Sequence, residues 1–184
     1  PVESRLLVKM TNSLRHRGPD DEGYVLAHTA SASIQPFRGG DTISAIRHPD
    51  INDRALLGRN SNLGLGWRRL SIIDLSPTGH QPMSNADQSI WIVFNGEIYN
   101  YIELRKDLAA KGFVFRTQSD TEAIVHAYSA WGQDCVHHLN GMWSFALYDA
   151  LNKRLFCSRD RFGIKPFYYY WDGTTFRFAS EIKA

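Results

Sequence analysis

The sequence predicts an α+β fold, in which helices and antiparallel strands form separate layers. Strands outnumber helices, the helices group in the middle of the chain, and the last third is nearly all strand. This order fits a layered α+β protein better than alternating βαβ units. The chain has 184 residues, which is enough for one domain with a full core.

The first half of the chain begins with a helix and continues with irregular segments. Apolar residues recur at helical spacing over residues 3–15, and Gly18 with Pro19 ends that pattern. Residues 29–62 are polar and have no firm period, so we expect a long loop or insertion that is mobile. A strand over residues 63–74 follows, and then a turn over residues 76–79.

The second half alternates briefly between the two types and then becomes strand-rich. A buried strand over residues 90–94 precedes a helix from residue 102 that stops at Gly112. Residues 113–115 predict a short strand, and Ser119 or Asp120 can cap a helix that runs to Trp131. Turns at 149–153 and 172–173 separate the remaining predicted strands, over residues 142–148, 154–158, 167–171 and 176–179.

Composition excludes several classes of protein. Hydrophobic residues make up 43% and charged residues 22%, which is typical of a globular chain. A net charge of +2 argues against a nucleic-acid surface, and no segment approaches the roughly 20 apolar residues of a membrane span. No signal peptide opens the chain, and two cysteines cannot build a disulfide framework. We therefore expect a cytoplasmic protein that binds neither nucleic acid nor membranes.

The first candidate site is Asn95-Gly96-Glu97, directly after the apolar strand. Glycine exposes its N–H, so the Asn95 amide and the Gly96 N–H could together stabilise an oxyanion. The Glu97 carboxylate could bind an ammonium group. Taken alone, Asn-Gly is more often a hairpin turn, and that simpler alternative is favoured.

Two further candidates are an arginine and a carboxylate. Arg68 and Arg69 point to opposite faces of their strand, so one of them faces the core or a pocket, where a carboxylate partner suits arginine. The simpler alternative is an edge-strand arginine in solvent. Asp120 stands at a helix start, where capping is the ordinary role, but its carboxylate could also bind an amine.

Metal and thiol chemistry receive little support. The histidines are scattered, and no metal-ligand spacing occurs. Cys135 and Cys157 each lie in a pattern typical of packed core, which argues against a nucleophile. We expect residues 159–163 to form a structural salt-bridge turn.

In combination these motifs closely resemble one family. The series resembles the glutaminase domain of glutamine-hydrolysing asparagine synthetases, which are class II glutamine amidotransferases of the N-terminal-nucleophile hydrolase family. The resemblance covers nearly the whole chain outside residues 29–62, and implies a four-layer αββα sandwich of two antiparallel sheets. It rests on the following stretches, in this order: LRHRGPDDEG, RRLSIIDLSPTGHQPM, VFNGEIYNY, TQSDTEAI, LNGMWSFALYD, RDRFGIKPFYY and FRFASEIKA.

The resemblance also implies an activity and a set of site residues. Glutamine is hydrolysed to glutamate and ammonia through a thioester on an N-terminal cysteine, whose α-amine is the base. The implied substrate-binding residues are Arg69 for the α-carboxylate, the backbone of Ile72 and Ile73, and Glu97 with Asp120 for the α-ammonium. Asn95 and Gly96 match the oxyanion donors. The domain itself needs no cofactor or metal.

The chain departs from the family pattern in four ways. It lacks the opening cysteine segment, so residues 1–184 are expected to be an N-terminally incomplete, inactive glutaminase domain whose missing segment is omitted from this sequence rather than lost from the gene. Trp67 replaces a histidine that is common in relatives. Residues 29–62 form an insertion without an assigned role. The resemblance implies a C-terminal synthetase domain that uses ATP and Mg, and we expect it to begin after Ala184.

Several questions stay open at this point. The resemblance favours ammonia supply for the ATP-dependent amidation of aspartate to asparagine. The alternatives are a glutamine-binding or regulatory module without a nucleophile, and an amidotransferase with another acceptor, such as a surface-polysaccharide sugar. The expected partners are L-glutamine and the synthetase domain of the same full-length chain. A homodimer is open, since the sequence does not determine the oligomeric state.

Overall fold

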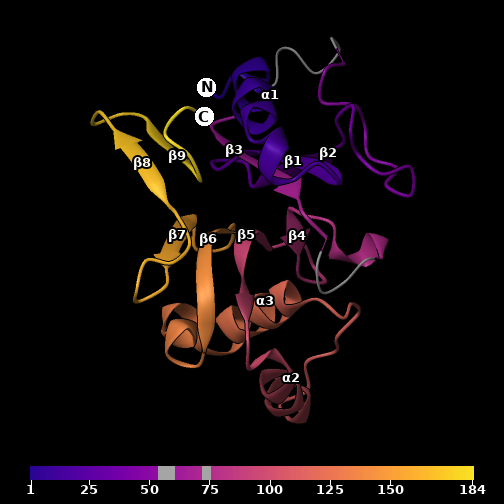
Figure 1. Ribbon diagram of the computed structural model, residues 1–184, viewed down its shortest axis with the longest axis vertical. Helices are drawn as coiled ribbons and strands as arrows, with labels where there is room; N and C mark the ends of the chain where they lie inside the picture. Colours follow the sequence, from indigo (N-terminus) through magenta and orange to yellow (C-terminus); the bar gives the residue numbers. More distant parts are fainter. Residues whose placement is uncertain (54–60, 72–75) are drawn as a thin grey trace. The chain divides into compact units, whose positions relative to one another are not determined.

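The chain divides into two units, each of which combines a sheet with helices (Figure 1). The computed structural model describes residues 1–53, 61–71 and 76–184. The first unit comprises residues 1–71, 80–82 and 166–184, and the second comprises residues 72–79 and 83–165.

The first unit is built on a three-stranded antiparallel sheet in the order β2-β1-β3. Its strands are β1 (Asp21–His28), β2 (Ser33–Phe37) and β3 (Leu63–Arg69). The sequence did not predict β1, and β2 lies inside the segment 29–62 that was expected to be a loop. The expectation of a loop is therefore wrong over Ser33–Phe37, because β2 pairs along its whole length with β1, and the expectation of an insertion over residues 29–62 stays a prediction.

Helix α1 (Ser4–Ser13) packs on this sheet and is followed by the 3₁₀ turn η1 (Arg15–Arg17). Two glycines of β3 allow the close approach: a Cβ at Gly64 would lie 3.1 Å from Leu7 Cδ2, and a Cβ at Gly66 would overlap the Thr11 hydroxyl. The predicted helix over residues 3–15 is therefore confirmed. Its apolar face packs against a core that contains Tyr24, Leu26, Phe37 and Ile51.

A separate two-stranded antiparallel ribbon completes the first unit. It consists of β8 (Tyr168–Trp171) and β9 (Phe176–Ala179), both of which the sequence predicted. Asp172 holds the connecting turn by accepting hydrogen bonds from the N–H groups of Thr174 and Thr175. The described residues thus form three antiparallel sheets, where two were expected.

The second unit is built on a four-stranded antiparallel sheet in the order β4-β5-β6-β7. Its strands are β4 (Met83–Ser84), β5 (Ile90–Ile98), β6 (Gly141–Asp149) and β7 (Arg154–Arg159), and η3 (Pro77–Gly79) precedes them. The predicted strands over residues 90–94, 142–148 and 154–158 are confirmed, and β5 extends four residues further than predicted, to Ile98.

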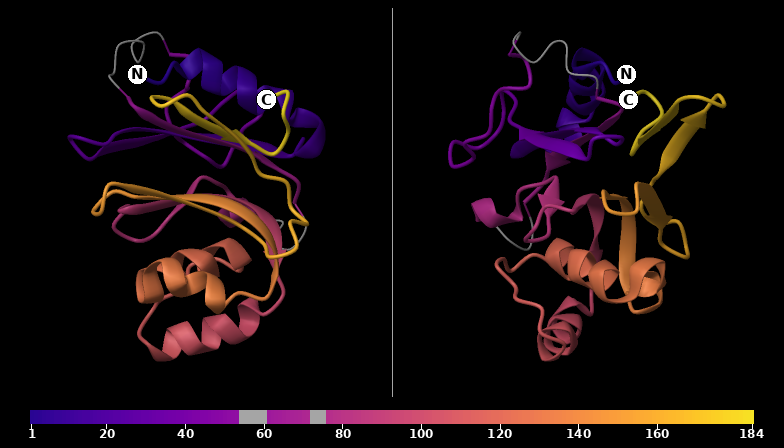
Figure 2. Two further views of the ribbon diagram at one scale, coloured as in Figure 1. Left: turned by 90° about the vertical axis from the view of Figure 1, so that its left-hand side faces the viewer. Right: turned by 180° about the vertical axis from the view of Figure 1, so that it is seen from behind.

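Helices α2 (Tyr101–Ala110) and α3 (Asp120–Trp131) lie on one side of this sheet (Figure 2), and η4 (Gly132–His137) follows α3. Ser119 caps α3 through its side chain, which accepts the Thr121 N–H at 3.1 Å. The apolar residues that the helices and the sheet bury together include Ile92, Phe94, Ile98, Leu104, Leu108, Ile124, Phe145 and Leu147.

The predicted short strand over residues 113–115 is wrong. Phe113 and Phe115 instead pack against the ring of His126, with centroids 5.2 and 4.6 Å away. Glu122 binds the following backbone by accepting the N–H groups of Arg116 and Thr117, each at 2.7 Å. Burial opposes the charge of Glu122, but His126, whose Nε2 lies 3.5 Å from Glu122 Oε1, and the hydrogen bonds from Arg116 and Thr117 lower its pKa to about 2.

The predicted α+β class is confirmed, since each unit contributes a helix layer and an antiparallel sheet. Among the described residues, no helix combines the length and apolarity needed to cross a membrane.

Candidate active site

The Asn95-Gly96 pair lies inside a strand and does not form a turn. Both residues belong to β5, where Asn95 pairs with Ser144 and Gly96 with Trp143 of β6. The hairpin alternative is therefore wrong. A paired strand fixes the backbone of both residues far more firmly than a loop would, and such fixed donors are what oxyanion stabilisation requires.

Strand alternation places Asn95 and Glu97 on the same face of β5. Phe94 and Ile98 belong to the core with α2 and α3, so Asn95 and Glu97 lie on the opposite face, and both side chains are half-buried. Gly96 is required sterically, because a Cβ there would overlap the carbonyl oxygen of Met142 on β6. Gly96 therefore allows β5 to lie close to the backbone of β6 while Asn95 and Glu97 project from the opposite face.

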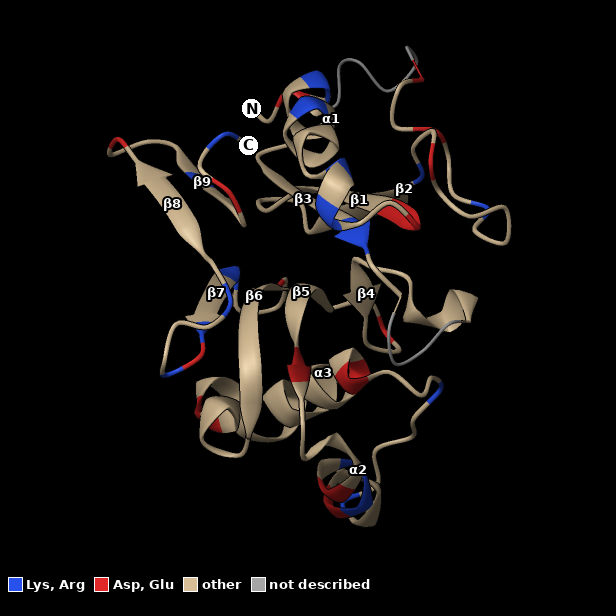
Figure 3. Cartoon of the chain, in the orientation of Figure 1, with Lys and Arg blue, Asp and Glu red and all other residues tan. Residues whose placement is uncertain are grey.

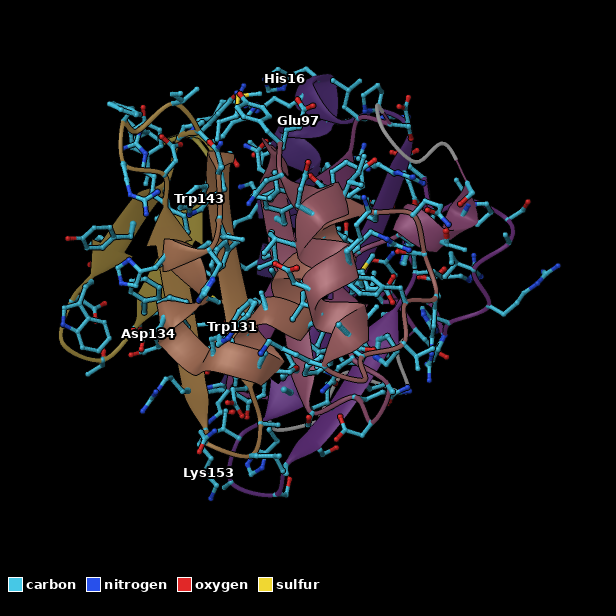
Figure 4. All side chains as sticks on the ribbon, turned by 90° about the horizontal axis from the view of Figure 1, so that it is seen from below. His16, Glu97, Trp131, Asp134, Trp143 and Lys153 are labelled. Atoms are coloured by element: carbon cyan, nitrogen blue, oxygen red, sulfur yellow. The ribbon has the colours of Figure 1, made fainter. Side chains whose placement is uncertain are left out.

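Asp120 is buried beside the end of β5. Its Oδ2 accepts the Ile98 N–H at 3.0 Å, and the residue is 5% exposed. Burial raises the pKa of Asp120, and the Glu97 carboxylate raises it further, while the Ile98 hydrogen bond acts in the opposite sense. Figure 3 shows acidic segments in β5 and in the first turn of α3, and Figure 4 labels Glu97.

The carboxylates Glu97 and Asp120 thus form an acidic pair, for which the described residues of the second unit provide no counter-charge. In the part of the second unit that the structure describes, neither carboxylate forms an ion pair with a lysine, arginine or histidine. The pKa of Asp120 is raised mainly by burial, and the nearby charge of Glu97 adds to that effect, so ionisation of Asp120 carries a cost. A cation that bound here would relieve that cost.

Arg68 and Arg69 end β3 in the first unit, and both are buried. The Arg68 side chain is 3% exposed and donates to Glu22 Oε2 at 2.9 Å and to Asp41 Oδ2 at 2.8 Å. Arg69 is 6% exposed and faces the other side of the sheet. The solvent alternative is therefore wrong for both arginines, and the expectation of a carboxylate partner is met at Arg68.

Three consecutive acidic residues, Asp20 just before β1 and Asp21 and Glu22 at its start, lie beside the end of β3 that carries the two arginines, an arrangement that the sequence did not predict (Figure 3). Asp20 accepts the Ser71 N–H at 2.8 Å. Asp21, which is fully buried, pairs with His80 Nδ1 at 2.8 Å. Their order, directly before a run of apolar residues, is the signal that could have indicated structural roles.

Glu22 and Asp21 also fasten the segment that follows β2. Glu22 Oε1 accepts the Asp41 N–H at 2.8 Å, and Asp21 Oδ1 accepts the Ile43 N–H at 3.0 Å. The Thr42 hydroxyl donates to the Glu22 carbonyl oxygen at 2.7 Å. This part of the predicted insertion is therefore tied directly to the strands that carry Arg68 and Arg69.

Trp67, the departure from the family pattern, contacts the same group of residues. Its ring meets the His80 ring edge-on with centroids 6.1 Å apart, and His48 lies 6.2 Å from His80. Burial lowers the pKa of His48, and the neighbouring His80 lowers it further. Trp67 lies on the same face of β3 as Arg69.

The predicted site residues are distributed over both units. Arg69 belongs to the first unit, and Asn95, Gly96, Glu97 and Asp120 belong to the second. Within the second unit, the structure brings Glu97 and Asp120 together. Ile72 and Ile73, predicted to line the site with their backbone, lie outside the described residues.

The thiols and the charged bend have structural roles. Burial raises the pKa of Cys135 to about 12 and that of Cys157 to about 11, so neither thiol ionises readily.

Asp160 accepts the backbone N–H groups of Trp143, Phe162, Ile164 and Lys165, and Arg159 donates to the carbonyl oxygens of Gly163 and Lys165. The expected salt bridge is therefore wrong: the charges of this turn bind backbone. No group of three or more His, Cys, Asp or Glu side chains among the described residues is placed to hold a metal ion.

Comparisons with known proteins agree on one family. The glutamine amidotransferase domain matches residues 40–184. Two asparagine synthetases [glutamine-hydrolyzing] of Bacillus subtilis are similar: number 1 is 37% identical over 99% of the chain, and number 3 is 44% identical over 78% of the chain. The chain spans 23% of the length of each of these relatives.

Two solved structures have a similar fold. One is the glutamine phosphoribosylpyrophosphate amidotransferase of B. subtilis, with a TM-score of 0.71 and 19% identity over 95% of the chain and 39% of that structure. The other is an allosteric regulatory enzyme of purine biosynthesis, with a TM-score of 0.71 and 20% identity over 96% of the chain and 39% of that structure. This likeness supports the predicted αββα type of fold.

Proposed function

The chain belongs to the glutamine amidotransferase domain family, and from this premise we propose that it hydrolyses L-glutamine to glutamate and ammonia as one domain of a longer synthetase. The observation that supports this most directly is the acidic pair Glu97 and Asp120, which lacks a counter-charge among the described residues of its unit. A substrate ammonium group would supply that charge.

Each polar site residue then has a role that suits its chemistry. Arg69 binds the α-carboxylate, for which the planar guanidinium offers two parallel donors. Glu97 and Asp120 bind the α-ammonium group. The Asn95 amide and the Gly96 N–H donate to the oxyanion that forms when the side-chain carbonyl of glutamine is attacked. The backbone of Ile72 and Ile73 completes the set by resemblance to the family.

The attacking thiol comes from outside residues 1–184 in this proposal. Cys135 and Cys157 are poor nucleophiles, because burial raises the pKa of both thiols and the thiolate is the reactive form. A cysteine at the mature N-terminus would provide the nucleophile, and its own α-amine would accept the thiol proton. In this proposal, residues 1–184 on their own would not hydrolyse glutamine.

Aspartate is the proposed acceptor of the ammonia. The names of the B. subtilis relatives support asparagine synthesis, and their greater length leaves room for a synthetase domain that uses ATP and Mg. That domain is the proposed partner within the full-length chain. The support for asparagine synthesis comes from the names and the length of the relatives alone. The second candidate is therefore a glutamine-binding module without a nucleophile.

A glutaminase assay on the full-length gene product tests the proposal. We expect ammonia release from glutamine that iodoacetamide abolishes. Arg69→Ala should raise the KM for glutamine at least about tenfold, since a buried charge-assisted contact is lost. Arg177→Ala is the control, because Arg177 is exposed on β9. An active enzyme that resists alkylation, or an unchanged KM in Arg69→Ala, contradicts the assignment.

A further inference from the structure

We propose that Asp20 is a positioning residue for Arg69: it fixes the backbone on either side of the arginine and so sets where the guanidinium meets the substrate carboxylate. This inference rests on the proposed function, because it assumes that Arg69 binds glutamine. Asp20 itself is exposed and acts only through the backbone of its neighbours.

Two hydrogen bonds connect Asp20 to the Arg69 segment. The Asp20 N–H donates to the carbonyl oxygen of Arg69 at 3.0 Å, and Asp20 Oδ2 accepts the Ser71 N–H at 2.8 Å. The ladder between β1 and β3 ends with the pair Asp21 and Arg69. The two hydrogen bonds of Asp20 therefore continue the connection between the two chain segments past the last pair of the β1–β3 ladder. Without them, the backbone that follows Arg69 would have no such bond to the β1 segment.

A close backbone contact reinforces this attachment. A Cβ at Gly18 would lie 2.6 Å from the carbonyl carbon of Arg68 and 2.7 Å from the nitrogen of Arg69. Gly18 is buried, so the chain from Gly18 to Asp20 lies directly against the backbone of the two arginines. The contact comes from main-chain atoms, which cannot move aside as a flexible side chain can.

The two neighbouring carboxylates have different tasks. Asp21 binds His80 and the Ile43 N–H, while Glu22 binds the Arg68 guanidinium. Of the three carboxylates, Asp20 is the one whose described side-chain bond goes to the segment after Arg69. The roles are therefore separable by substitution.

Position matters for this residue because bidentate recognition needs two parallel N–H···O contacts at once. A shift of about 1 Å in a binding group can cost a large factor in rate or affinity, even when the substitution lies outside the site. Loss of the Ser71 hydrogen bond would free the backbone after Arg69. The guanidinium would then sample positions that bind the carboxylate poorly.

The test is steady-state glutaminase kinetics on the full-length gene product carrying Asp20→Ala, Asp20→Asn or Asp172→Ala. Asp20→Ala should raise the KM for glutamine about tenfold and leave kcat within about twofold, because chemistry at the amide is untouched. Asp20→Asn retains an acceptor oxygen and should restore the wild-type KM. Asp172→Ala is the matched control, since Asp172 also accepts two backbone N–H groups but in the β8–β9 turn.

Each outcome decides the matter. A wild-type KM in Asp20→Ala, with a raised KM in Arg69→Ala, overturns this inference and leaves the proposed function intact. An unchanged KM in Arg69→Ala contradicts the proposed function itself, and with it the role assigned to Asp20. If Asp20→Ala does not fold, Asp20→Leu, which has no acceptor atom in its side chain, replaces it. Unfolding of both would show that Asp20 maintains the fold rather than the arginine, and would also overturn the proposal.

Discussion

The proposed binding role of Asp120 conflicts with the stability of the folded protein. The carboxylate is 5% exposed, and burial raises its pKa above that of the unfolded chain. The carboxyl group of Asp120 therefore ionises less readily in the folded protein than in the unfolded chain. Its ionisation at neutral pH lowers the free energy of unfolding. As pH falls through the raised pKa, the group takes up a proton and this cost disappears.

Substitution of Asp120 by asparagine should separate the two effects. Asp120→Asn keeps an acceptor for the Ile98 N–H and removes the charge. We expect the unfolding free energy at pH 7 to increase by about 0.5–2 kcal/mol, and glutamine binding to weaken at least about tenfold. Urea unfolding at pH 7 and pH 4 measures the first effect, which should shrink at the lower pH. A variant that is less stable than the wild type at pH 7 would contradict the assigned cost of the charge.

The local sequence around the site residues indicates what chemistry their side chains can do, but it does not indicate their secondary structure or their partners in the fold. Asn95-Gly96 alone favours a turn, and its placement inside β5 follows from pairing with β6, more than forty residues later. The roles of Asp20 and Asp21 likewise depend on Ser71 and His80, which are distant in sequence. Short-range patterns contain no information about such partners, so only the resemblance of the whole series pointed to a shared site.

At the scale of elements, the contact between α1 and β3 depends on small residues. Thr11 is buried, its hydroxyl donates to the Leu7 carbonyl oxygen at 2.9 Å, and a Cβ at Gly66 would overlap that hydroxyl. The strand next to α1 therefore requires glycine, because a larger residue would push the helix away from the sheet.

Gly66→Ala should destabilise the protein by about 1–3 kcal/mol through this overlap. Gly40→Ala is the matched control, because no atom lies within 4 Å of a Cβ at Gly40. Urea unfolding of both variants checks the difference. Adding Thr11→Ala to Gly66→Ala should recover part of the loss, as expected for two residues in contact. Equal stability of the Gly40 and Gly66 variants would refute the steric explanation.

Element prediction succeeded where periodicity was regular and failed where polar side chains fix the backbone. The amphipathic helix α1 and the strands of the last third were found from their patterns. Strand β1 was missed because it opens with two acidic residues, Asp21 and Glu22, whose burial is explained by partners on other segments. Residues 113–115 read as a strand, but their aromatic rings pack on His126.

At the scale of the whole molecule, substitution of the two cysteines tests whether the nucleophile lies within residues 1–184. Substitution of Cys135 by alanine and of Cys157 by serine should leave the glutaminase kcat of the full-length gene product within about threefold, because burial raises the pKa of both thiols. Iodoacetamide should still abolish the activity of the doubly substituted enzyme. Activity lost in either variant, with the fold intact by circular dichroism, would place the nucleophile inside residues 1–184.

The fold class could be predicted because it depends on the order of helices and strands, which the local patterns reveal. The division into two units could not, since it depends on which strands pair: residues 166–184 belong with the N-terminal part of the chain although 83 intervening residues, 83–165, belong to the other unit. Pairing over such distances is a property of the folded chain, and one sequence gives no direct record of it.

Ligand binding at the acidic pair also has a proton balance. At a pH below the raised pKa of Asp120, part of the protein population carries a proton on that carboxyl group. An ammonium group that binds to Glu97 and Asp120 favours the ionised form, so the bound proton is released to the buffer. Under the proposed function, the affinity for glutamine would then increase with pH across the interval between the pKa of the free protein and that of the complex.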